Sequence, residues 1–416
     1  MSLLIKNAVL HNLKRDVLII DGYISKIEED IDDHTDYTLD ASGKFLIPSF
    51  KNGHAHSGMT ILRGYADDMK LQPWLEEKIW PAEAKLTPEA IYWGTRLAAL
   101  EMIKSGTTFC NDMYFNFESS QKAYIDSGIK SASGPALFDF FDPAKAELMK
   151  NNCKNDIENK DISQNNSLTL AAHSIYTLSK DSLKWIAEFA GSNNIPVHIH
   201  LSETEKEVTD CISKYGIRPA ELLKETGLLD INLIAAHTIW LDDNEINLLA
   251  ENNVTVVHNP VSNMKISTGG VFPYKKLKDK NIKIMLGTDS CASNNNLDMF
   301  EDMKIAALLQ KFHTNNPEIM KSEEIFDIAT GNEALTFSQL SSRIEVGAHA
   351  DCLLLDQNAP ELIPSHNIIS NLVYSANGSC VDTVICNGEI LMENRRVKDE
   401  EEIIDHIRSI AKKILM

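Results

Sequence analysis

The sequence predicts an α/β protein, a (β/α)8 barrel with a small β domain built from both ends of the chain. From about residue 49 to 340, apolar strand-like runs alternate with amphipathic stretches of helix length, such as TLAAHSIYTL, KDSLKWIAEFAGSNN and IPVHIHLSE. A helix-length segment between successive strands favours a parallel sheet over a sandwich. The 416 residues exceed the ~250 that a barrel alone commonly takes, which leaves room for a second, smaller domain.

Both ends of the chain have β texture. Residues 1–48 contain short alternating runs such as LLIKNAVL and VLIIDGYISKIEE, and residues 341–416 return to this pattern in HADCLLLDQ and VDTVICNGEILMENRRV. The pair Asn387-Gly388 is typical of a hairpin turn, and a final helix is expected at about 401–415. We expect residues 1–48 and 341–416 to pair into one small β sandwich beside a barrel domain at 49–340.

The composition narrows the classes of partner. The chain has 40 Lys and Arg against 60 Asp and Glu, and a net charge of −20 disfavours binding to nucleic acids or anionic membranes. Neither a signal peptide nor an apolar run of membrane-spanning length is evident, so we expect a cytoplasmic protein with a small-molecule substrate. The seven cysteines form no metal-binding motif and are expected to be buried free thiols.

Histidines stand in pairs at the ends of two predicted strands. His54 and His56 in FKNGHAHSG lie two residues apart, so β geometry turns both imidazoles to the same side. In VHIHLSE, His200 is nearer the strand end than His198, which is expected to pack behind it, and Glu203 follows in the loop. A single His-x-His is more often two unrelated histidines in a turn.

Two further strand ends carry polar residues, His237 in IAAHTIW and Asp289 in IMLGTDSCASNN. Alone, such an Asp is more often a helix cap and such a His a packed core residue. All four groups, however, occur at the ends of successive predicted strands, which converge at the mouth of a barrel. Imidazoles and a carboxylate suit one divalent metal, with zinc the first expectation and iron or manganese compatible with the same ligand types. Such a metal acidifies water, and a nearby carboxylate and imidazole can move protons.

An ordered series of motifs resembles the amidohydrolase superfamily, in particular its branch of S-adenosylhomocysteine/5′-methylthioadenosine deaminases and triazine chlorohydrolases. The resemblance covers nearly the whole chain, and it is carried by GHAHSGMTILRGYADD, PWLEEKIWPAEAKLTPEAIYWGTRLAALEMIKSGTTFCNDMYF, HIHLSET, HNPVSNMK, LGTDS and VDTVICNGEI. It implies a TIM barrel of amidohydrolase type and a hydrolase that acts on C–N bonds of cyclic amidines.

The resemblance also implies roles for single residues. The metal ligands would be His54, His56, His200 and Asp289, with Asp289 also accepting a proton from the attacking water. Glu203 would transfer a proton to a ring nitrogen, and His237 would orient the nucleophile. Glu83 in WPAE matches a position that holds ribose hydroxyls, and His173 in AAHSIYTLS matches one that contacts the ring. Taken alone, Glu83 could be a solvated helix carboxylate and His173 a structural histidine.

Two departures from relatives narrow the prediction. The fourth barrel strand, in SLTLAAHSIYTLS, offers His173 and no lysine that could be carboxylated to bridge two metals, so a single metal is expected. Relatives that accept S-adenosylhomocysteine place arginines near the segment that reads GIKSASGPALFDFFDPAKAELMK here, which contains none. Lys145 or Lys150 could replace them only as point charges, because lysine lacks the planar fork of arginine.

The leading hypothesis is therefore a hydrolytic deaminase of a 6-aminopurine nucleoside: 5′-methylthioadenosine, adenosine, 5′-deoxyadenosine or S-adenosylhomocysteine. The runner-up is attack on another aromatic N-heterocycle, such as a free purine, a pterin or a triazine. A third reading is a barrel that has lost catalysis and serves as a binding protein, since a fold alone does not fix function. A homo-oligomer is expected from the resemblance.

Overall fold

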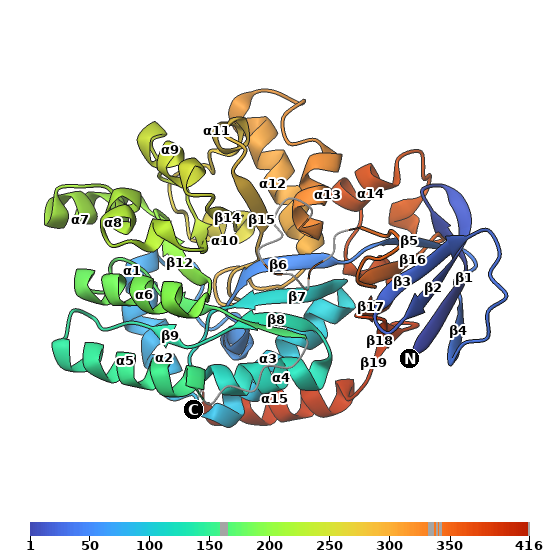
Figure 1. The fold of residues 1–416 in the computed structure, drawn as a ribbon, viewed down its shortest axis with the longest axis horizontal. Helices are drawn as coiled ribbons and strands as arrows, with labels where there is room; N and C mark the ends of the chain where they lie inside the picture. Colours follow the sequence, from blue (N-terminus) through green and yellow to red (C-terminus); the bar gives the residue numbers. More distant parts are fainter. Residues whose placement is uncertain (159–164, 332–336, 338–339, 341–342, 415–416) are drawn as a thin grey trace.

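The computed structural model describes residues 1–158, 165–331, 337, 340 and 343–414. Its centre is a set of parallel strands surrounded by helices, and a separate sheet formed by both chain ends stands at one side (Figure 1). Among the described residues, no helix combines the length and the apolar character that crossing a membrane requires.

The parallel strands form two sheets, in the orders β10-β8-β7-β6 and β15-β14-β13-β12-β11-β9. Their bounds are β6 Phe50–Ala55, β7 Thr107–Asp112, β8 Lys130–Ser133, β9 Ala136–Leu137, β10 Asn166–Leu168, β11 Leu170–Ala172, β12 Val197–Leu201, β13 Leu233–His237, β14 Thr255–His258 and β15 Lys283–Leu286. A β-bridge between Ala55 and Asp289 joins the end of β6 to the chain after β15.

The division into two sheets has a local cause. The third barrel strand is interrupted between β8 and β9, and the fourth at Thr169 between β10 and β11. At this point a Cβ on Gly134 would lie 1.8 Å from the carbonyl oxygen of Thr169. Only glycine permits so close an approach of two backbones. If β8 and β9 are counted as one strand, and β10 and β11 as another, the barrel has eight strands, which confirms the predicted (β/α)8 barrel.

Helices connect and cover these strands (Figure 1). The longer ones are α3 Pro88–Lys104, α4 Phe117–Ser127, α5 Pro143–Glu158, α6 Lys180–Asn193, α7 Glu205–Tyr215, α9 Asp243–Glu251, α12 Met299–Thr314, α13 Ser322–Thr330 and α15 Glu400–Ile414. Shorter ones are η1 Ser57–Leu62, α1 Leu71–Pro73, η2 Trp74–Ile79, α2 Trp80–Glu83, α8 Pro219–Glu225, η3 Leu228–Asp230, α10 Pro260–Lys265, α11 Tyr274–Asp279, η4 Pro360–Leu362, α14 Ile368–Tyr374 and η5 Gly378–Cys380.

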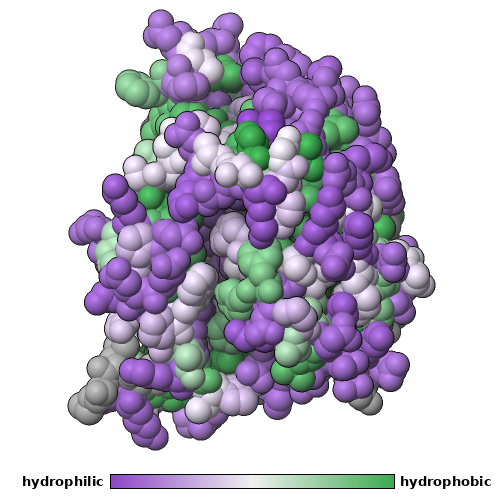
Figure 2. Space-filling model, turned by 90° about the vertical axis from the view of Figure 1, so that its left-hand side faces the viewer, coloured by the Kyte–Doolittle hydropathy of each residue, from purple (hydrophilic) through white to green (hydrophobic). Residues whose placement is uncertain are grey.

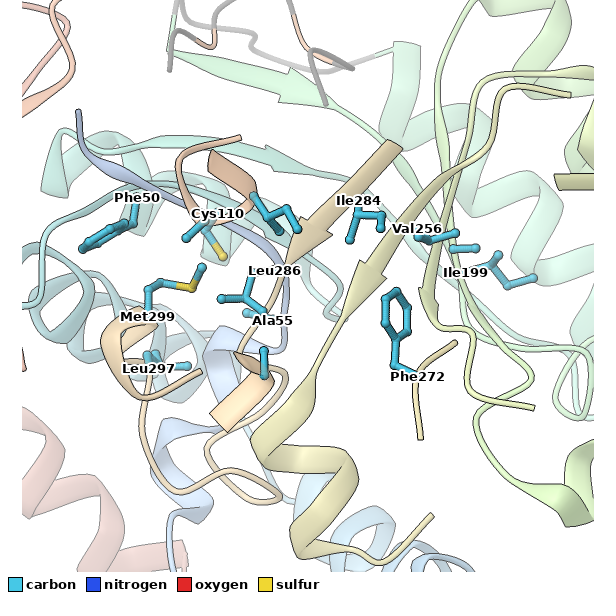
Figure 3. Close-up of a cluster of buried hydrophobic side chains, with 14 of the residues drawn as sticks. Phe50, Ala55, Cys110, Ile199, Val256, Phe272, Ile284, Leu286, Leu297 and Met299 are labelled. Atoms are coloured by element: carbon cyan, nitrogen blue, oxygen red, sulfur yellow. The ribbon is translucent and has the colours of Figure 1, made fainter. Parts of the chain in front are cut away.

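Helix α6 shows how the sequence sets these elements. The hydroxyl of Ser179 caps its first turn by accepting from the Ser182 amide, and Asn194 ends it in the left-handed conformation. Between these caps, Leu183, Ile186 and Ala190 recur at helical spacing and are buried. Side chains of this kind join the strands in one continuous core, part of which is drawn in Figure 3.

Both chain ends form one nine-stranded sheet of order β19-β18-β17-β16-β5-β1-β2-β3, with β4 beside β1. The bounds are β1 Ser2–Leu10, β2 Leu13–Ile20, β3 Tyr23–Glu28, β4 Tyr37–Asp40, β5 Lys44–Pro48, β16 Cys352–Asp356, β17 Val381–Cys386, β18 Glu389–Glu393 and β19 Arg396–Val397. Antiparallel pairing of β5 with β16 joins the two termini as predicted. The predicted hairpin is also confirmed, since Asn387 and Gly388 turn β17 into β18 with φ of 50° and 77°.

This terminal sheet curls until its edge meets itself. The amide of Ile24 donates to the Ala348 carbonyl at 2.9 Å, and that of Ala350 to Gly22 at 2.8 Å, so β3 contacts the segment that leads into β16. The curled sheet encloses a separate apolar cluster that includes Leu3 and Leu354. The terminal sheet lies beside the barrel, and the predicted site is at the carboxyl ends of the barrel strands.

Candidate metal centre and active site

The four predicted metal ligands meet at the carboxyl ends of β6, β12 and β15. The Nε2 atoms of His56 and His200 lie 3.2 Å apart, and Asp289 Oδ1 lies 3.4 Å from His54 Nε2 and 3.3 Å from His56 Nε2. Ligands at the usual Zn–N and Zn–O lengths on the corners of a tetrahedron are separated by about 3.3 Å. The spacing therefore fits a metal of this size.

The second ring nitrogen of each histidine is already engaged, which leaves Nε2 available. The Nδ1 contacts are His54 with His198 Nε2 at 2.9 Å, His56 with the Met113 carbonyl at 2.7 Å, and His200 with the His173 carbonyl at 2.7 Å. A carbonyl can only accept, so His56 and His200 carry a proton on Nδ1, and the neutral form of each ring presents a lone pair on Nε2. Metal-binding histidines are oriented in this way by their outer partners.

The electrostatics agree with a ligand set. Burial lowers the pKa of His54 to about 4 and that of His200 well below its usual value, so both imidazoles are neutral. Burial acts on His56 in the same direction, but contact with Asp289 outweighs it and the net shift of its pKa is upward. For Asp289, burial raises the pKa, yet the adjacent His54 and His56 more than reverse this and keep the carboxylate ionised. Neutral imidazole and ionised carboxylate are the forms that bind metal, so His54, His200 and Asp289 already have the binding form, whereas His56 gives up the proton that Asp289 favours when a metal binds.

His198 lies behind the ligands. Its Nε2 faces His54 Nδ1, and both side chains are fully buried. It therefore orients His54 and does not reach the metal group, as the sequence led us to expect. Asp289 is oriented in a comparable manner, since the Ser262 hydroxyl donates to Oδ2 at 2.6 Å and leaves Oδ1 toward the imidazoles.

Glu203 lies on one side of the four proposed metal ligands, and it is 5 % exposed. Burial raises the pKa of its carboxyl group. Its backbone is fixed by Glu207, which sequence reasoning missed: the two Glu207 oxygens accept the amides of Ser202 and Glu203, each at 2.8 Å. The only sequence signal for Glu207 is its place in the first turn of α7, where acidic residues are common whether or not they serve a site.

His237, at the end of β13, lies next to the same group. His54, His237 and Asp289 present ligand atoms within 4.8 Å of one another, and His237 Nδ1 is 3.8 Å from Glu203 Oε1. The ring is held from behind, because Nδ1 is 2.8 Å from the Asn263 side-chain oxygen. An Nδ1 proton shared with that oxygen leaves Nε2 free to interact with a nucleophile.

Glu83 and His173 line the same cavity, of about 140 Å³, as the metal group and Glu203. The Tyr114 hydroxyl donates to Glu83 Oε1 at 2.9 Å, and burial raises the pKa of Glu83 to about 7. Burial also lowers the pKa of His173 to about 3, so its ring is neutral. Its Nδ1 is 3.0 Å from the Thr177 hydroxyl. The structure thus brings together every predicted site residue, and it adds Tyr114.

The walls of this cavity are mainly apolar and aromatic. They are formed by η1, by the segment from α1 to α2 and by the loops after β7, β9 and β11. The wall residues include Met59, Leu71, Trp74, Leu75, Ile79, Trp80, Phe115, Phe138, Phe140 and Tyr176. One side of the molecule is visibly hollowed near its centre, with both hydrophilic and hydrophobic residues at the rim of the hollow (Figure 2). A flat aromatic ring suits walls of this kind.

All seven cysteines are buried and free, as predicted, and none belongs to the metal group. Burial raises the pKa of Cys110 and Cys291 above the range in which a thiolate forms. The chemistry of this site is consequently that of imidazoles and carboxylates.

A family model described as the amidohydrolase family matches residues 45–391, most of the chain. The chain belongs to the amidohydrolase family. It is 46% identical over 385 residues to a 5′-deoxyadenosine deaminase of Methanoregula boonei, covering 91% of this chain and 86% of that protein. It is 47% identical over 386 residues to a 5-methylthioadenosine/S-adenosylhomocysteine deaminase of Archaeoglobus fulgidus, covering 91% and 90%.

Two solved structures agree with the fold. An adenosine deaminase from Xanthomonas campestris with bound zinc superposes with a TM-score of 0.89 at 31% identity, covering 99% of this chain and 98% of that one. An atrazine chlorohydrolase from Arthrobacter aurescens, complexed with zinc, reaches a TM-score of 0.90 at 20% identity over 98% and 100% of the chains, a likeness of fold alone.

Proposed function

We propose that this amidohydrolase hydrolytically deaminates a 6-aminopurine nucleoside to the inosine-type product and ammonia. The observation that carries the proposal is a single cavity in which two carboxyl groups accompany the proposed ligand Asp289: buried Glu203 beside the metal group, and half-buried Glu83 held by Tyr114. The first suits a purine ring and the second a ribose diol. The names of the similar proteins supply the candidate substrates: 5′-deoxyadenosine, 5′-methylthioadenosine, S-adenosylhomocysteine and adenosine.

The ligand set proposed for one divalent ion, zinc in the first place, is His54, His56, His200 and Asp289. The donor types and spacing described above support it, as does the buried Nε2 of His54, which has no hydrogen-bond partner in the described structure. Iron and manganese suit the same donors. When bound, such an ion lowers the pKa of water and so supplies a nucleophile near neutral pH.

Proton transfer falls to two carboxyl groups with opposite pKa shifts. Asp289, ionised, accepts a proton from the attacking water while that water forms a bond to the carbon bearing the amine. Glu203, whose raised pKa lets it hold a proton, donates to the adjacent ring nitrogen and accepts again as the intermediate collapses. The amine takes up the proton held by Asp289, the C–N bond breaks and ammonia leaves, while the added hydroxyl gives its proton to Glu203 and becomes the ring carbonyl.

Two histidines assist without binding the metal in this proposal. His237, with its Nδ1 proton held by Asn263, presents Nε2 to orient the nucleophile. His173, neutral and in the cavity wall, contacts the ring. Glu83 binds the ribose hydroxyls, and this assignment separates a nucleoside deaminase from an enzyme for a free purine, a pterin or a triazine.

The test is incubation of zinc-loaded protein with adenosine, 5′-methylthioadenosine, 5′-deoxyadenosine, S-adenosylhomocysteine, guanine and isoxanthopterin, following ammonia and the ultraviolet spectrum. We expect turnover of the adenine nucleosides. Activity on guanine or isoxanthopterin alone would keep the barrel and the metal site but overturn the nucleoside assignment. Elemental analysis of protein purified without chelator identifies the ion, and a protein that holds none tightly would favour a binding role.

A further inference from the structure

The loop that follows β9 forms an aromatic wall beside the proposed ribose site. Phe138 and Phe140 line the active-site cavity, with their ring centroids 5.2 Å apart. Phe140 also meets Trp80 edge to face at 5.8 Å. Trp80 begins α2, the short helix that ends at Glu83. A nucleoside whose sugar contacts Glu83 therefore places its 5′ group near these three rings.

The backbone of this loop is held in an unfavourable conformation. Phe140 and Phe141 have φ of 50° and 61°, a region that residues with a Cβ seldom occupy, least of all two in succession. Asp139 holds the loop, because its carboxylate accepts the amides of Phe141 at 2.7 Å and Ser179 at 3.0 Å. The Phe140 amide donates to the Thr177 carbonyl at 2.9 Å. Strain retained in this way at a cavity points to a required position for the Phe140 ring.

A second cavity, of about 540 Å³, lies on the other side of the wall. It shares Phe115, Ala136, Phe138 and Phe140 with the active-site cavity. Lys145 lines the second cavity and not the first, with its Nζ 5.4 Å from the centroid of the Phe140 ring. Among the described residues that line the active-site cavity, there is no lysine or arginine. A carboxylate at the 5′ end of a substrate would thus find no cation on the active-site side.

We infer that Phe138 and Phe140 determine specificity at the 5′ position, and that they favour a small uncharged group such as hydrogen or methylthio over one that ends in an amino acid. The inference rests on the proposed nucleoside deamination. Apolar 5′ groups gain contact with the rings, whereas a zwitterionic tail loses water without gaining an ionic partner. Phe140 separates such a tail from Lys145.

The experiment compares kcat/KM for 5′-deoxyadenosine, 5′-methylthioadenosine and S-adenosylhomocysteine in the zinc-loaded protein. Differences of this kind in an apolar pocket reach ~10-fold or more, and we expect at least that preference for the two apolar substrates. F140A opens the wall toward Lys145 and should reduce the preference. F141A is the matched control. Phe141 is 41% exposed, against 42% for Phe140, and its backbone is in the same left-handed region. Its ring, however, contacts Lys214 and lies outside both cavities.

A third variant, K145A, changes a surface side chain and serves even where F140A does not fold. We expect it to leave S-adenosylhomocysteine turnover unchanged, and to remove the gain when combined with F140A. Equal kcat/KM for all three substrates in the unchanged protein, an unaltered ratio in folded F140A, or a loss of S-adenosylhomocysteine turnover in K145A would each overturn the inference alone. No turnover of any adenine nucleoside would instead overturn the proposed function, and the inference with it.

Discussion

Replacement of Tyr114 by phenylalanine isolates one hydrogen bond in the proposed ribose site. The Tyr114 hydroxyl donates to Glu83 at 2.9 Å, and its ring lies so close to Gly58 that a Cβ there would be 2.4 Å from a ring carbon. Phenylalanine fills the same space, so Y114F removes the donor and little else. The effect should then reach the substrate through the charge of Glu83.

The size of that effect follows from the pKa. Burial raises the pKa of Glu83 to about 7, and the bond from Tyr114 opposes this shift. A hydrogen bond to a charged group is worth about 1.5 kcal/mol net, or about one pKa unit, so the pKa in Y114F should be about 8. At pH 7 the ionised fraction of Glu83 then falls from about one half to about one tenth. If the ionised form binds the diol, kcat/KM falls about five-fold at pH 7 and recovers by about pH 9.

The assay is the pH profile of kcat/KM for adenosine in both proteins, alongside 2′,3′-dideoxyadenosine, which has no diol. A carboxyl group with a raised pKa is ionised mainly above that pKa, so kcat/KM for adenosine should rise as the pH passes the pKa of Glu83. In Y114F this rise should occur at a higher pH. The control Y92F removes another hydroxyl bonded to a carboxylate, that of Asp126, away from the cavity. An equal loss for both substrates, or an unshifted profile, would refute the reasoning.

Three further predictions concern the groups behind and beside the proposed metal ligands. H198A removes the partner of His54 and should weaken zinc binding ~10–100-fold in competition with a chelator. The surface variant H406A should bind zinc as the unchanged protein does. Equal zinc affinities in H198A and the unchanged protein would show that the contact between His54 and His198 does not support metal binding. E203Q should lower kcat by ~10²-fold or more with zinc still bound, and near-normal kcat would remove Glu203 from proton transfer. Burial raises the pKa of Glu207 from 4.5 to about 8, so its contribution to stability is complete below pH 4.5 and lost as pH rises through 8. The difference in urea midpoint between E207Q and the unchanged protein should therefore vary with pH, and a constant difference would contradict this.

The barrel, and the convergence of polar residues at its strand ends, could be predicted because both depend on simple geometry. Parallel strands align their carboxyl ends, so polar residues at the ends of successive strand-like runs must converge. This convergence is seen for His54, His56, His200 and Asp289. His198 precedes His200 by two residues on the same strand and lies behind this group. The domain limits at 48/49 and 340/341 stay a prediction, which we retain as a proposal.

The supporting residues could not be predicted, because they depend on contacts between distant segments. Glu207 resembles any acidic residue in a first helical turn, and the partner of Tyr114 lies 31 positions earlier in the chain. The sequence also gave no indication of the backbone conformation at two site residues. His237 and Asp289 have φ of 71° and 62°, although neither is a glycine. Local preference argues against such conformations, and only the surrounding structure maintains them.

The site therefore has two layers with different origins. The proposed metal group needs only the strand ends, which the barrel supplies. The residues proposed to select a substrate lie in the segments 71–83 and 138–141, which are positioned by hydrogen bonds to Asp139 and by the contact of Trp80 with Phe140. Substitutions in those two segments can alter the cavity without moving a ligand atom. Variants of Phe140 should accordingly change the ratio of kcat/KM values between nucleosides while the affinity for zinc stays constant. A parallel loss of zinc affinity would show instead that the two layers are coupled.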